Sequence, residues 1–258
     1  MSSEKVDFGY KKVSPQEKTR RVGGVFASVA TRYDVMNDLI SLGSHRLIKR
    51  MTIQMSSVRK GHRVLDLAGG TGDLAALYSP IVGAEGTVVL SDINEAMMAV
   101  GRDRLMDEGL TNISYCQANA EVLPFDDCSF NCVTIGFGLR NVTHKDLALK
   151  EMNRVLKPGG TLLVLEFSKP TNPIIDTAYG VFQSLWPSVG KLVTGDSQSY
   201  RYLVESIRVH PDQKNLKLMM QDAGLQEVEY HNIMSGVVAI HRGAKSGAKS
   251  GAKSGTKE

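Results

Sequence analysis

The sequence of 258 residues has few cysteines, a single tryptophan and no long apolar run. Its three cysteines, Cys116, Cys128 and Cys132, form no CxxC pair, and its six histidines form no HxxxH pair. These absences argue against a disulfide framework and a zinc site, and we expect buried, reduced thiols. No segment approaches the roughly 18 apolar residues of a membrane-spanning helix, and the polar start MSSEKVDFGYKK fits neither a signal peptide nor a transit peptide. We therefore expect a cytoplasmic protein.

Positive charge is concentrated at the two ends of the chain. Residues 1–60 carry 12 Lys and Arg against 5 Asp and Glu (+7), residues 61–242 carry 15 against 21 (−6), and residues 243–258 carry 4 against 1 (+3). A basic N-terminal segment on an acidic body argues against a broad nucleic-acid surface and permits local attraction to anionic lipid or to an anionic partner. Ordinary solvation of helices would produce the same distribution.

Composition divides the chain into three parts. Residues 1–60 carry two segments with helical apolar spacing, the first beginning at the capping signal Ser14-Pro15-Gln16-Glu17. We expect a helical lid with membrane contact there, and the Gly23-Gly24 pair is a candidate break in its first helix. Residues 61–242 form the main domain. Residues 243–258 repeat a Gly-Ala-Lys-Ser unit without large apolar side chains, so we expect a disordered tail.

The main domain predicts an α/β fold. Segments rich in β-branched or aromatic residues alternate with helix-like stretches, at residues 64–68, 87–92, 113–118, 130–137 and 161–167. This alternation predicts a doubly wound sheet of parallel strands with right-handed crossovers. Two further strands, at residues 225–233 and 236–242, have so short a connection that they should be antiparallel.

A glycine-rich turn follows the first strand of this domain, in the segment HRVLDLAGGTGDLA at residues 62–75. Gly69, Gly70 and Gly72 therefore lie where an open parallel sheet binds its ligand. Because glycine has no Cβ, a ligand can lie against the main chain and meet the N–H groups of the following helix. A tight turn without a ligand is the weaker alternative.

Two classes of cofactor fit this turn. Residues 70–75 match G-x-G-x-x-G/A, and Asp92 lies 20 residues after Gly72 at the end of the second strand, which allows NAD. Asp66 precedes the loop, however, where its charge would repel a pyrophosphate and attract the ammonium of S-adenosylmethionine. Asn119-Ala120, after the third strand, could read the edge of adenine, although an asparagine there could equally cap a helix. Together these features favour S-adenosylmethionine.

In this order, the motifs resemble those of the ubiquinone/menaquinone biosynthesis C-methyltransferases over residues 18–242. The matching runs are YDVMND (33–38), LDLAGGTGD (65–73), QANAEVLPF (117–125), FGLRNV (137–142), RVLKPGG (154–160), LEFSKP (165–170) and SYRYLVESI (199–207). The resemblance implies the class I S-adenosylmethionine-dependent methyltransferase fold, an α/β, Rossmann-like seven-stranded sheet with an antiparallel last strand, plus N-terminal helices. It also implies an enzyme that methylates a ring carbon of demethylmenaquinol or of 2-methoxy-6-polyprenyl-1,4-benzoquinol.

Motif position and resemblance together define an expected cofactor site. Its residues are Asp66, Gly70, Thr71, Gly72, Asp92, Asn119, Ala120 and Gly136. The resemblance assigns Thr71 to the loop, Asp92 to the ribose and Asn119-Ala120 to the adenine. The family commonly has a serine at Gly136 and an aromatic residue at Ile48. Loss of the serine hydroxyl removes one hydrogen bond, worth on the order of 1 kcal/mol, so we expect weaker cofactor binding with retained activity.

Methyl transfer to a ring carbon requires an electron-rich, reduced quinol whose ring hydroxyl loses its proton during attack. Arg140 and Asn141 follow the fourth strand, so we expect Arg140 to stabilise the developing phenolate and Asn141 to hold a bridging water. Arg140 could instead pair with Asp34 or Glu166. Histidines at positions 45 and 144 are alternative bases.

The expected partners follow from this substrate, whose polyprenyl tail resides in the bilayer. We expect reversible, salt-sensitive contact with the inner face of the cytoplasmic membrane, and an assembly of quinone-biosynthesis proteins, but neither metal nor nucleic acid. The apolar lid residues expected at this contact are Phe26, Tyr33, Met36 and Leu39. The alternatives are a methyltransferase for another phenolic, sterol or lipid acceptor, an inactive scaffold with the cofactor fold, and a dehydrogenase.

Overall fold

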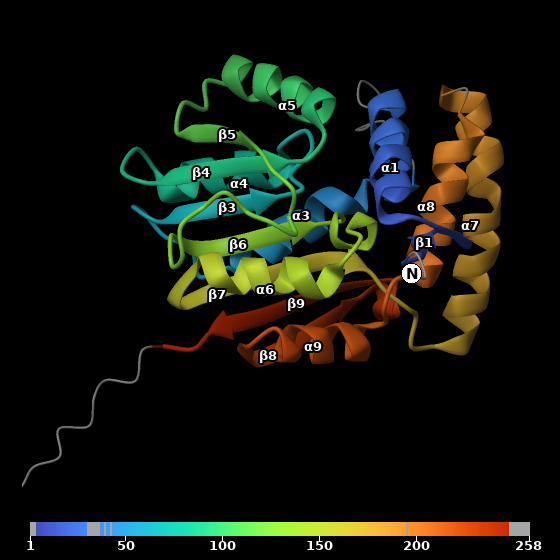
Figure 1. The fold of residues 1–258 in the computed structure, drawn as a ribbon. Helices are drawn as coiled ribbons and strands as arrows, with labels where there is room; N and C mark the ends of the chain where they lie inside the picture. The colour runs from blue at the N-terminus through green and yellow to red at the C-terminus, as the bar shows by residue number, and fades with distance from the viewer. Residues whose placement is uncertain (1–3, 30–36, 39, 42, 195, 248–258) are drawn as a thin grey trace, which may run out of the picture.

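A seven-stranded sheet forms the centre of the molecule (Figure 1). The computed structural model describes residues 4–29, 37–38, 40–41, 43–194 and 196–247. The strands of this sheet are β3 (Arg63–Leu67), β4 (Thr87–Asp92), β5 (Ile113–Gln117), β6 (Phe130–Gly136), β7 (Leu156–Phe167), β8 (Leu225–Ile233) and β9 (Val238–Lys245). They lie in the order β5-β4-β3-β6-β7-β9-β8, and β9 is antiparallel to both of its neighbours while the remaining pairs are parallel. The predicted doubly wound sheet with an antiparallel final pair is confirmed.

Both faces of the sheet are buried. Successive side chains of a strand point to opposite faces, and in the central strands apolar side chains point to both faces. On β3, Leu65 and Leu67 belong to one core and Val64 to the other. The first core is closed by α6 (Lys145–Val155) and α9 (Gln213–Asp222). The second core is closed by α3 (Ser44–Gln54), α4 (Asp73–Val82) and α5 (Glu95–Asp107).

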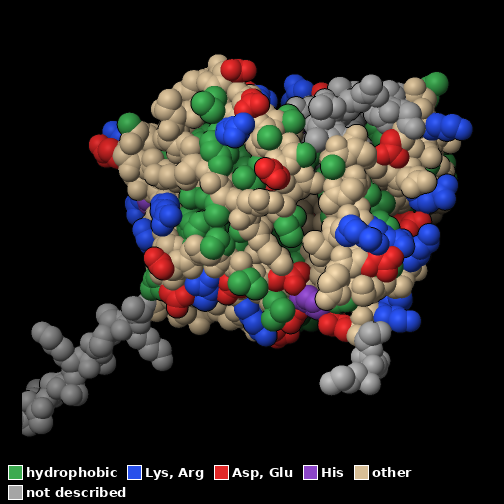
Figure 2. Space-filling view, turned by 45° about the horizontal axis from the view of Figure 1, so that its top comes forward, with side chains coloured by type: hydrophobic (Ala, Val, Ile, Leu, Met, Phe, Trp, Pro, Cys, Tyr) green, Lys and Arg blue, Asp and Glu red, His purple; other side chains and the backbone are tan. Residues whose placement is uncertain are grey.

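A further layer stands at the carboxyl edge of the parallel strands (Figure 1). It consists of the hairpin of β1 (Val6–Phe8) and β2 (Lys11–Val13) together with α1 (Pro15–Val29), α7 (Pro173–Thr194) and α8 (Ser197–Val209). Helix α8 packs against both α7 and α1. Figure 2 shows many Lys and Arg side chains, interspersed with Asp and Glu, at this end of the molecule. Among the described residues, no helix is long and apolar enough to cross a membrane.

Helix α1 begins where the capping signal predicts. The Ser14 Oγ accepts the backbone N–H of Glu17 at 3.2 Å, and Pro15 is the first helical residue. The helix then runs through Gly23 and Gly24 without a break. Each glycine costs a helix about 1 kcal/mol relative to alanine, and burial of neighbouring side chains such as Val22 offsets that cost.

Several elements differ from the prediction. The β1–β2 hairpin, α7 and α8 were not expected, because single strands of three residues and a helix that depends on tertiary contacts leave weak local patterns. Strand β7 begins at Leu156, five residues before the predicted start at Thr161. The expected lid residues Tyr33, Met36 and Leu39, the alternative partner Asp34, and residues 248–258 of the tail lie outside the described residues.

Candidate functional site

The candidate site lies where the direction of strand order reverses, between β3 and β6. Both strands end in a non-glycine residue with left-handed backbone, Ala68 (φ +51°) and Phe137 (φ +54°). The two loops touch there, since a Cβ on Gly138 would lie 2.6 Å from the Cβ of Ala68. Left-handed backbone is strained for such residues and concentrates at functional sites. These two strained residues make the junction the candidate functional site.

A cavity of about 110 Å³ opens at the junction, between the loops and α1. Six of the ten predicted site residues line it: Gly70, Asp92, Asn119, Ala120, Gly136 and Asn141. Helix α1 closes the cavity with Val22, Gly23 and Phe26. The sheet topology thus brings together residues from four separate loops, as the sequence predicts.

Asp92 is the carboxylate that faces this cavity. Its side chain is held by two backbone N–H groups, because Oδ2 accepts that of Gly70 at 2.9 Å and Oδ1 accepts that of Asn94 at 2.8 Å. Burial raises the pKa of Asp92, and these backbone N–H groups oppose the rise. Each carboxylate oxygen has a further lone pair, so Asp92 can still accept a hydroxyl group from a ligand.

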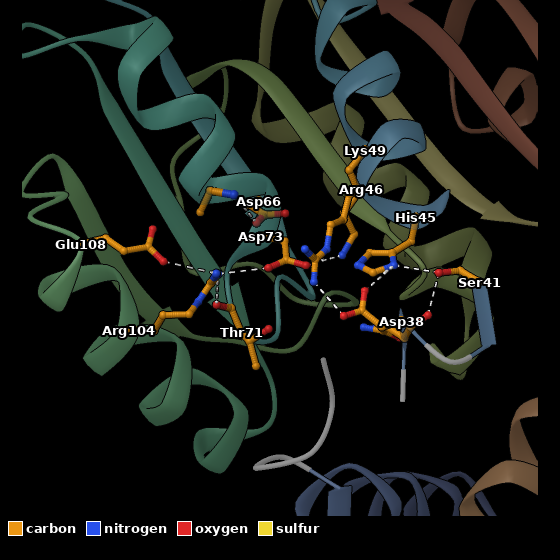
Figure 3. Close-up of polar contacts among 12 residues, drawn as sticks. Asp38, Ser41, His45, Arg46, Lys49, Asp66, Thr71, Asp73, Arg104 and Glu108 are labelled. Carbon is orange, nitrogen blue, oxygen red and sulfur yellow. Dashed lines mark hydrogen bonds and ion pairs between the residues drawn. The ribbon is translucent and has the colours of Figure 1, made fainter. Parts of the chain in front are cut away.

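The glycine loop is held rigidly at the start of α4. Gly70 and Gly72 have positive φ, +56° and +85°, and Gly72 is the N-cap of α4. Asp73 accepts from Lys49 at 2.6 Å and from Arg104 at 3.1 Å, and Arg104 also donates to the carbonyl oxygen of Thr71 at 2.8 Å (Figure 3). Burial opposes ionisation of Asp73, but these two cations outweigh it and lower its pKa. The residues of this loop that line the cavity are Ala68 and Gly70, and the predicted cofactor contacts of Thr71 and Gly72 stay predictions.

Asp66 lies beneath the loop, fully buried. Its Oδ2 accepts the N–H of Ala75 at 3.0 Å, and a Cβ on Gly69 would lie 2.8 Å from that same oxygen. The other oxygen, Oδ1, has no hydrogen-bond partner among the described residues. Burial raises the pKa of Asp66 to about 7. The close approach of Gly69 leaves no room for a side chain between Asp66 and the loop surface, and the predicted pairing of Asp66 with a ligand ammonium stays a prediction.

Asn119 and Ala120 form the wall of the cavity after β5. The Asn119 Oδ1 accepts the N–H of Glu121 at 3.0 Å, so the side chain closes a tight turn and does not cap a helix. The alternative reading of Asn119 as a helix cap is therefore wrong. Both Asn119 and Ala120 line the cavity.

A second cavity, of about 140 Å³, lies on the other side of Phe137. Its lining is largely apolar and includes five aromatic residues, Phe137, Phe167, Tyr179, Phe182 and Trp186. Phe137 lines both cavities, so the two adjoin at this residue. The aromatic residues of α7 were missed in the sequence, although their spacing at positions 179, 182 and 186 follows one helical face.

Arg140 lines this second cavity, and its charge is paired. Its guanidinium donates to Glu166 Oε1 at 2.9 Å and to the carbonyl oxygen of Phe137, and its backbone N–H donates to Glu166 Oε2 at 3.1 Å. Pairing with Glu166 is one of the two structural alternatives predicted for Arg140. Asn141 lies in the first cavity instead, where its Oδ1 accepts the hydroxyl of Tyr202 at 3.0 Å.

The two histidines proposed as bases occupy different environments. His45 is buried and lines the aromatic cavity, and its Nδ1 lies 2.8 Å from the hydroxyl of Ser41 and 3.7 Å from Asp38 Oδ1 (Figure 3). Burial and the nearby Lys49 lower the pKa of His45, which favours the neutral ring. His144 is partly exposed, lies 3.5 Å from Glu4 and lines neither cavity. Within the described residues, no group of three or more potential metal ligands occurs.

Known proteins resemble this chain in sequence and in fold. Residues 14–245 match the ubiE/COQ5 methyltransferase family. The chain is 61% identical over 240 residues to the ubiquinone/menaquinone biosynthesis C-methyltransferase UbiE of Pseudomonas putida (strain W619), covering 92% of this chain and 94% of that protein. It is 60% identical, with the same coverage, to the UbiE of Pseudomonas aeruginosa (strain LESB58). A SAM-dependent methyltransferase from Aquifex aeolicus shares the fold, with a TM-score of 0.59, 17% identity, and coverage of 82% of this chain and 96% of that one.

Proposed function

The chain belongs to the ubiE/COQ5 methyltransferase family, and we propose that it methylates a ring carbon of a polyprenylated quinol, with S-adenosylmethionine as methyl donor, in ubiquinone or menaquinone biosynthesis. One observation carries the proposal. A cavity lined by Gly70, Asp92 and Asn119 adjoins a second, apolar cavity, and Phe137 lines both. A nucleoside sulfonium on one side and an apolar ring on the other would meet across that side chain.

The residues of the first cavity fit the cofactor. Asp92 is positioned to accept ribose hydroxyls, and Asn119 and Ala120 to meet the adenine. Gly136 lines the same cavity without a Cβ, and the carboxylate of Asp66 beneath the loop supplies negative potential for an ammonium. When bound, S-adenosylmethionine supplies a methyl group carried on a positively charged sulfur.

The second cavity suits the quinol. Phe167, Tyr179, Phe182 and Trp186 provide an apolar wall for a ring and the start of a polyprenyl tail, and they exclude water from the transfer step. Only the reduced ring is electron-rich enough to attack a sulfonium methyl group. As its carbon attacks, the neighbouring ring hydroxyl must give up its proton or form a strong hydrogen bond.

We propose that His45, and not His144, is the base that accepts the proton of the ring hydroxyl. His45 is the histidine that lines the aromatic cavity, its ring is kept neutral by burial, and Ser41 and Asp38 orient its Nδ1. Arg140, held by Glu166, would stabilise the phenolate oxygen from the same wall, and Asn141 would hold a bridging water at the first cavity. The ion pair with Glu166 holds the Arg140 guanidinium in place as a fixed positive charge.

An assay with purified protein tests the function. We expect the protein to methylate demethylmenaquinol or 2-methoxy-6-polyprenyl-1,4-benzoquinol under reducing conditions. It should not methylate the corresponding quinones. Asp92→Asn should weaken S-adenosylmethionine binding at least tenfold in calorimetry, whereas Asp103→Asn, an exposed carboxylate on α5, should leave it unchanged. Absence of turnover with both quinols, despite intact cofactor binding, would overturn the proposal and favour a different phenolic or lipid acceptor.

A second assay tests the base. His45→Asn should lower kcat at least a hundredfold with S-adenosylmethionine affinity retained, and raising the pH should partly restore the rate because the ring hydroxyl then ionises in solution. His144→Asn provides the matched control and should retain the wild-type pH profile. Equal losses in the two variants would remove the assignment. In cells that lack the protein, mass spectrometry of extracted quinones should identify which unmethylated precursor accumulates.

The membrane and assembly partners belong to the same proposal. A polyprenyl acceptor resides in the bilayer, so the basic N-terminal layer is the surface proposed to meet the inner face of the cytoplasmic membrane, transiently and through charge. A complex with other quinone-biosynthesis proteins is the proposed alternative route for delivery of the quinol.

A further inference from the structure

A third cavity, of about 290 Å³, lies beneath the N-terminal hairpin and has a different chemistry from the other two. It is bounded by β1–β2, the start of α1, the segment before α6 and the end of α8. Five cationic side chains line it, against the single carboxylate of Asp7: Lys5, Lys12, Lys18, Arg140 and Lys145. Neither the cofactor nor an apolar quinol explains a cavity of this charge.

Two of these lysines share one acceptor. Lys18 and Lys145 donate to the carbonyl oxygen of Val142 at 3.0 Å and 3.2 Å. Lys18 is only 3% exposed, and neither ammonium forms an ion pair with any described carboxylate. Burial and then mutual repulsion lower the pKa of Lys18 to about 8, and burial also lowers that of Lys145. A buried cation beside a half-buried one, with no paired anion, is costly to the fold.

The nearby carboxylates are engaged elsewhere. Asp7 pairs with Lys12 at 2.7 Å. Glu121 accepts the backbone N–H groups of Thr143 and His144 at 3.1 Å and 3.0 Å, and Glu166 holds Arg140. Their charges act on Lys18 and Lys145 only at longer range, so these two lysines have no direct counter-ion among the described residues.

His210 adds unused hydrogen-bonding capacity in the same cavity. It is 3% exposed, lines the cavity wall, and neither of its ring nitrogens has a hydrogen-bond partner among the described residues. Burial and the cations at Lys145 and Arg140 keep its pKa well below the usual value. A neutral imidazole offers one N–H donor, and buried polar groups are normally satisfied.

From these observations we propose that the cavity is a binding site for a phosphate-type oxyanion, either inorganic phosphate or the phosphate of a lipid head group. Lys18 and Lys145 would pair with its charge, and His210 would donate a hydrogen bond to one of its oxygens. Water would also fit, since a water needs only about 10 to 15 Å³ of such volume, but water supplies no compensating charge. A multivalent oxyanion satisfies both the two ammonium groups and the unpartnered imidazole.

Titration of the full chain with inorganic phosphate tests the site. We expect saturable binding by calorimetry, at least tenfold weaker in Lys18→Gln and in Lys145→Gln. Lys11→Gln is the matched control, because Lys11 lies on the same hairpin, is exposed and does not line the cavity, and its affinity should stay within twofold of wild type. Melting curves show whether each variant folds, and if Lys18→Gln does not fold, Lys145→Gln decides.

Two results would overturn the proposal. One is the absence of saturable phosphate binding by the wild-type protein. The other is an equal loss in Lys11→Gln and the cavity variants, which would reduce the effect to general surface charge. Binding of the protein to vesicles that contain phosphatidic acid distinguishes the two sources of the anion. If free phosphate and Lys18→Gln both release the protein from these vesicles, the ligand is a lipid head group. If neither does, while phosphate binding still depends on Lys18, the ligand is the free ion.

Discussion

Gly136 shows how one residue couples the cofactor cavity to the core. The family resemblance leads to the expectation of a serine at this position, and a Cβ built there would lie 2.8 Å from Cδ1 of Leu74. Leu74 is buried on α4 and belongs to the core behind the sheet. Glycine at 136 and leucine at 74 are therefore mutually compatible, and the missing hydroxyl has a packing counterpart that the sequence alone does not reveal.

A double-mutant cycle tests whether Leu74 limits the side chain that position 136 can hold. Gly136→Ser should lower the free energy of unfolding by about 1 to 3 kcal/mol, because the added Cβ overpacks the core. Combining it with Leu74→Val, which removes the Cδ atoms, should cost less than the sum of the two single changes by at least about 0.5 kcal/mol. Urea unfolding of the four proteins measures the coupling. Strict additivity would show that Leu74 does not constrain position 136.

Asp66 is expected to make stability depend on pH. Its pKa is about 7 in the folded protein, against 3.8 for an unperturbed Asp. Between these values the folded state holds a proton that the unfolded state has lost, so stability is full below about pH 4 and falls as pH rises toward 7. Asp66→Asn removes this titration.

Urea unfolding from pH 4 to pH 8 measures the effect of Asp66. Relative to Asp66→Asn, the wild-type protein should lose stability as pH rises through this range, and the difference should level off above pH 7. Asp103→Asn, at an exposed site on α5, serves as the control and should give a curve parallel to wild type. A wild-type curve parallel to that of Asp66→Asn would show that Asp66 is already ionised at low pH.

At the scale of the element, α1 closes the cofactor cavity although it contains two adjacent glycines. Gly23 lines the cavity, and its carbonyl oxygen accepts the Asn94 side chain at 3.1 Å, which ties the helix to the loop after β4. Gly24 is exposed, and a Cβ there would meet no atom within 4 Å. Helix α1 therefore has two residues of low helix propensity where it closes the cavity.

Replacing Gly24 by alanine should stabilise the protein. We expect a gain of about 0.5 to 1 kcal/mol, because alanine favours the helix and loses less backbone entropy on folding. Gly43→Ala is the matched control, since a Cβ there also meets nothing within 4 Å but the backbone has φ +76°. It should destabilise the protein by a similar or larger amount. Thermal melting distinguishes the two, and equal shifts would contradict the conformational argument.

Helix α7 supplies the aromatic wall, and its place depends on other elements. Trp186 belongs to a small core with Tyr200, Leu203 and Ile207 of α8. Helix α7 therefore presents Tyr179 and Phe182 to the second cavity only because α8 supports it from the side. The acceptor pocket is a product of this helix pair.

At the scale of the whole molecule, the uneven charge predicts salt-sensitive membrane association. The N-terminal 60 residues carry a net +7 on a chain of net +4, so attraction to anionic lipid should be local to that end. We expect sedimentation with vesicles that contain phosphatidylglycerol, little with neutral vesicles, and release at high salt. Equal binding to both kinds of vesicle would contradict the electrostatic part.

Charge-reversed variants localise the contact. Lys11→Glu combined with Arg20→Glu alters two exposed residues of the N-terminal layer and should abolish vesicle binding. Lys150→Glu combined with Lys214→Glu changes the net charge equally on exposed positions of α6 and α9 and should have little effect. A similar loss in both pairs would assign the binding to net charge and not to the N-terminal surface.

Much of the fold and half of the candidate site were predictable because their signals are local. Strands such as β4 and the turn at Gly70 follow from short runs of residues whose backbone preferences and burial agree with the final structure. Asp92 and Asn119 were predictable as well, since residues that end parallel strands meet at one edge of the sheet. The aromatic cavity was not, because Phe137 and Trp186 are far apart in the sequence and meet only through packing.

By itself, the sequence determined the alternation of strands and helices in the main domain, the glycine turn and the acids at the strand ends, because these depend on backbone conformation and on periodic burial over a few residues. Only the tertiary structure decided which groups face a ligand. It buried Asp66 beneath the loop, paired Arg140 with Glu166, placed His45 in an aromatic wall and left Lys18 and Lys145 together with no counter-ion from the described part of the chain. Each of these outcomes depends on the burial and electrostatics of side chains from distant segments, which no local pattern specifies.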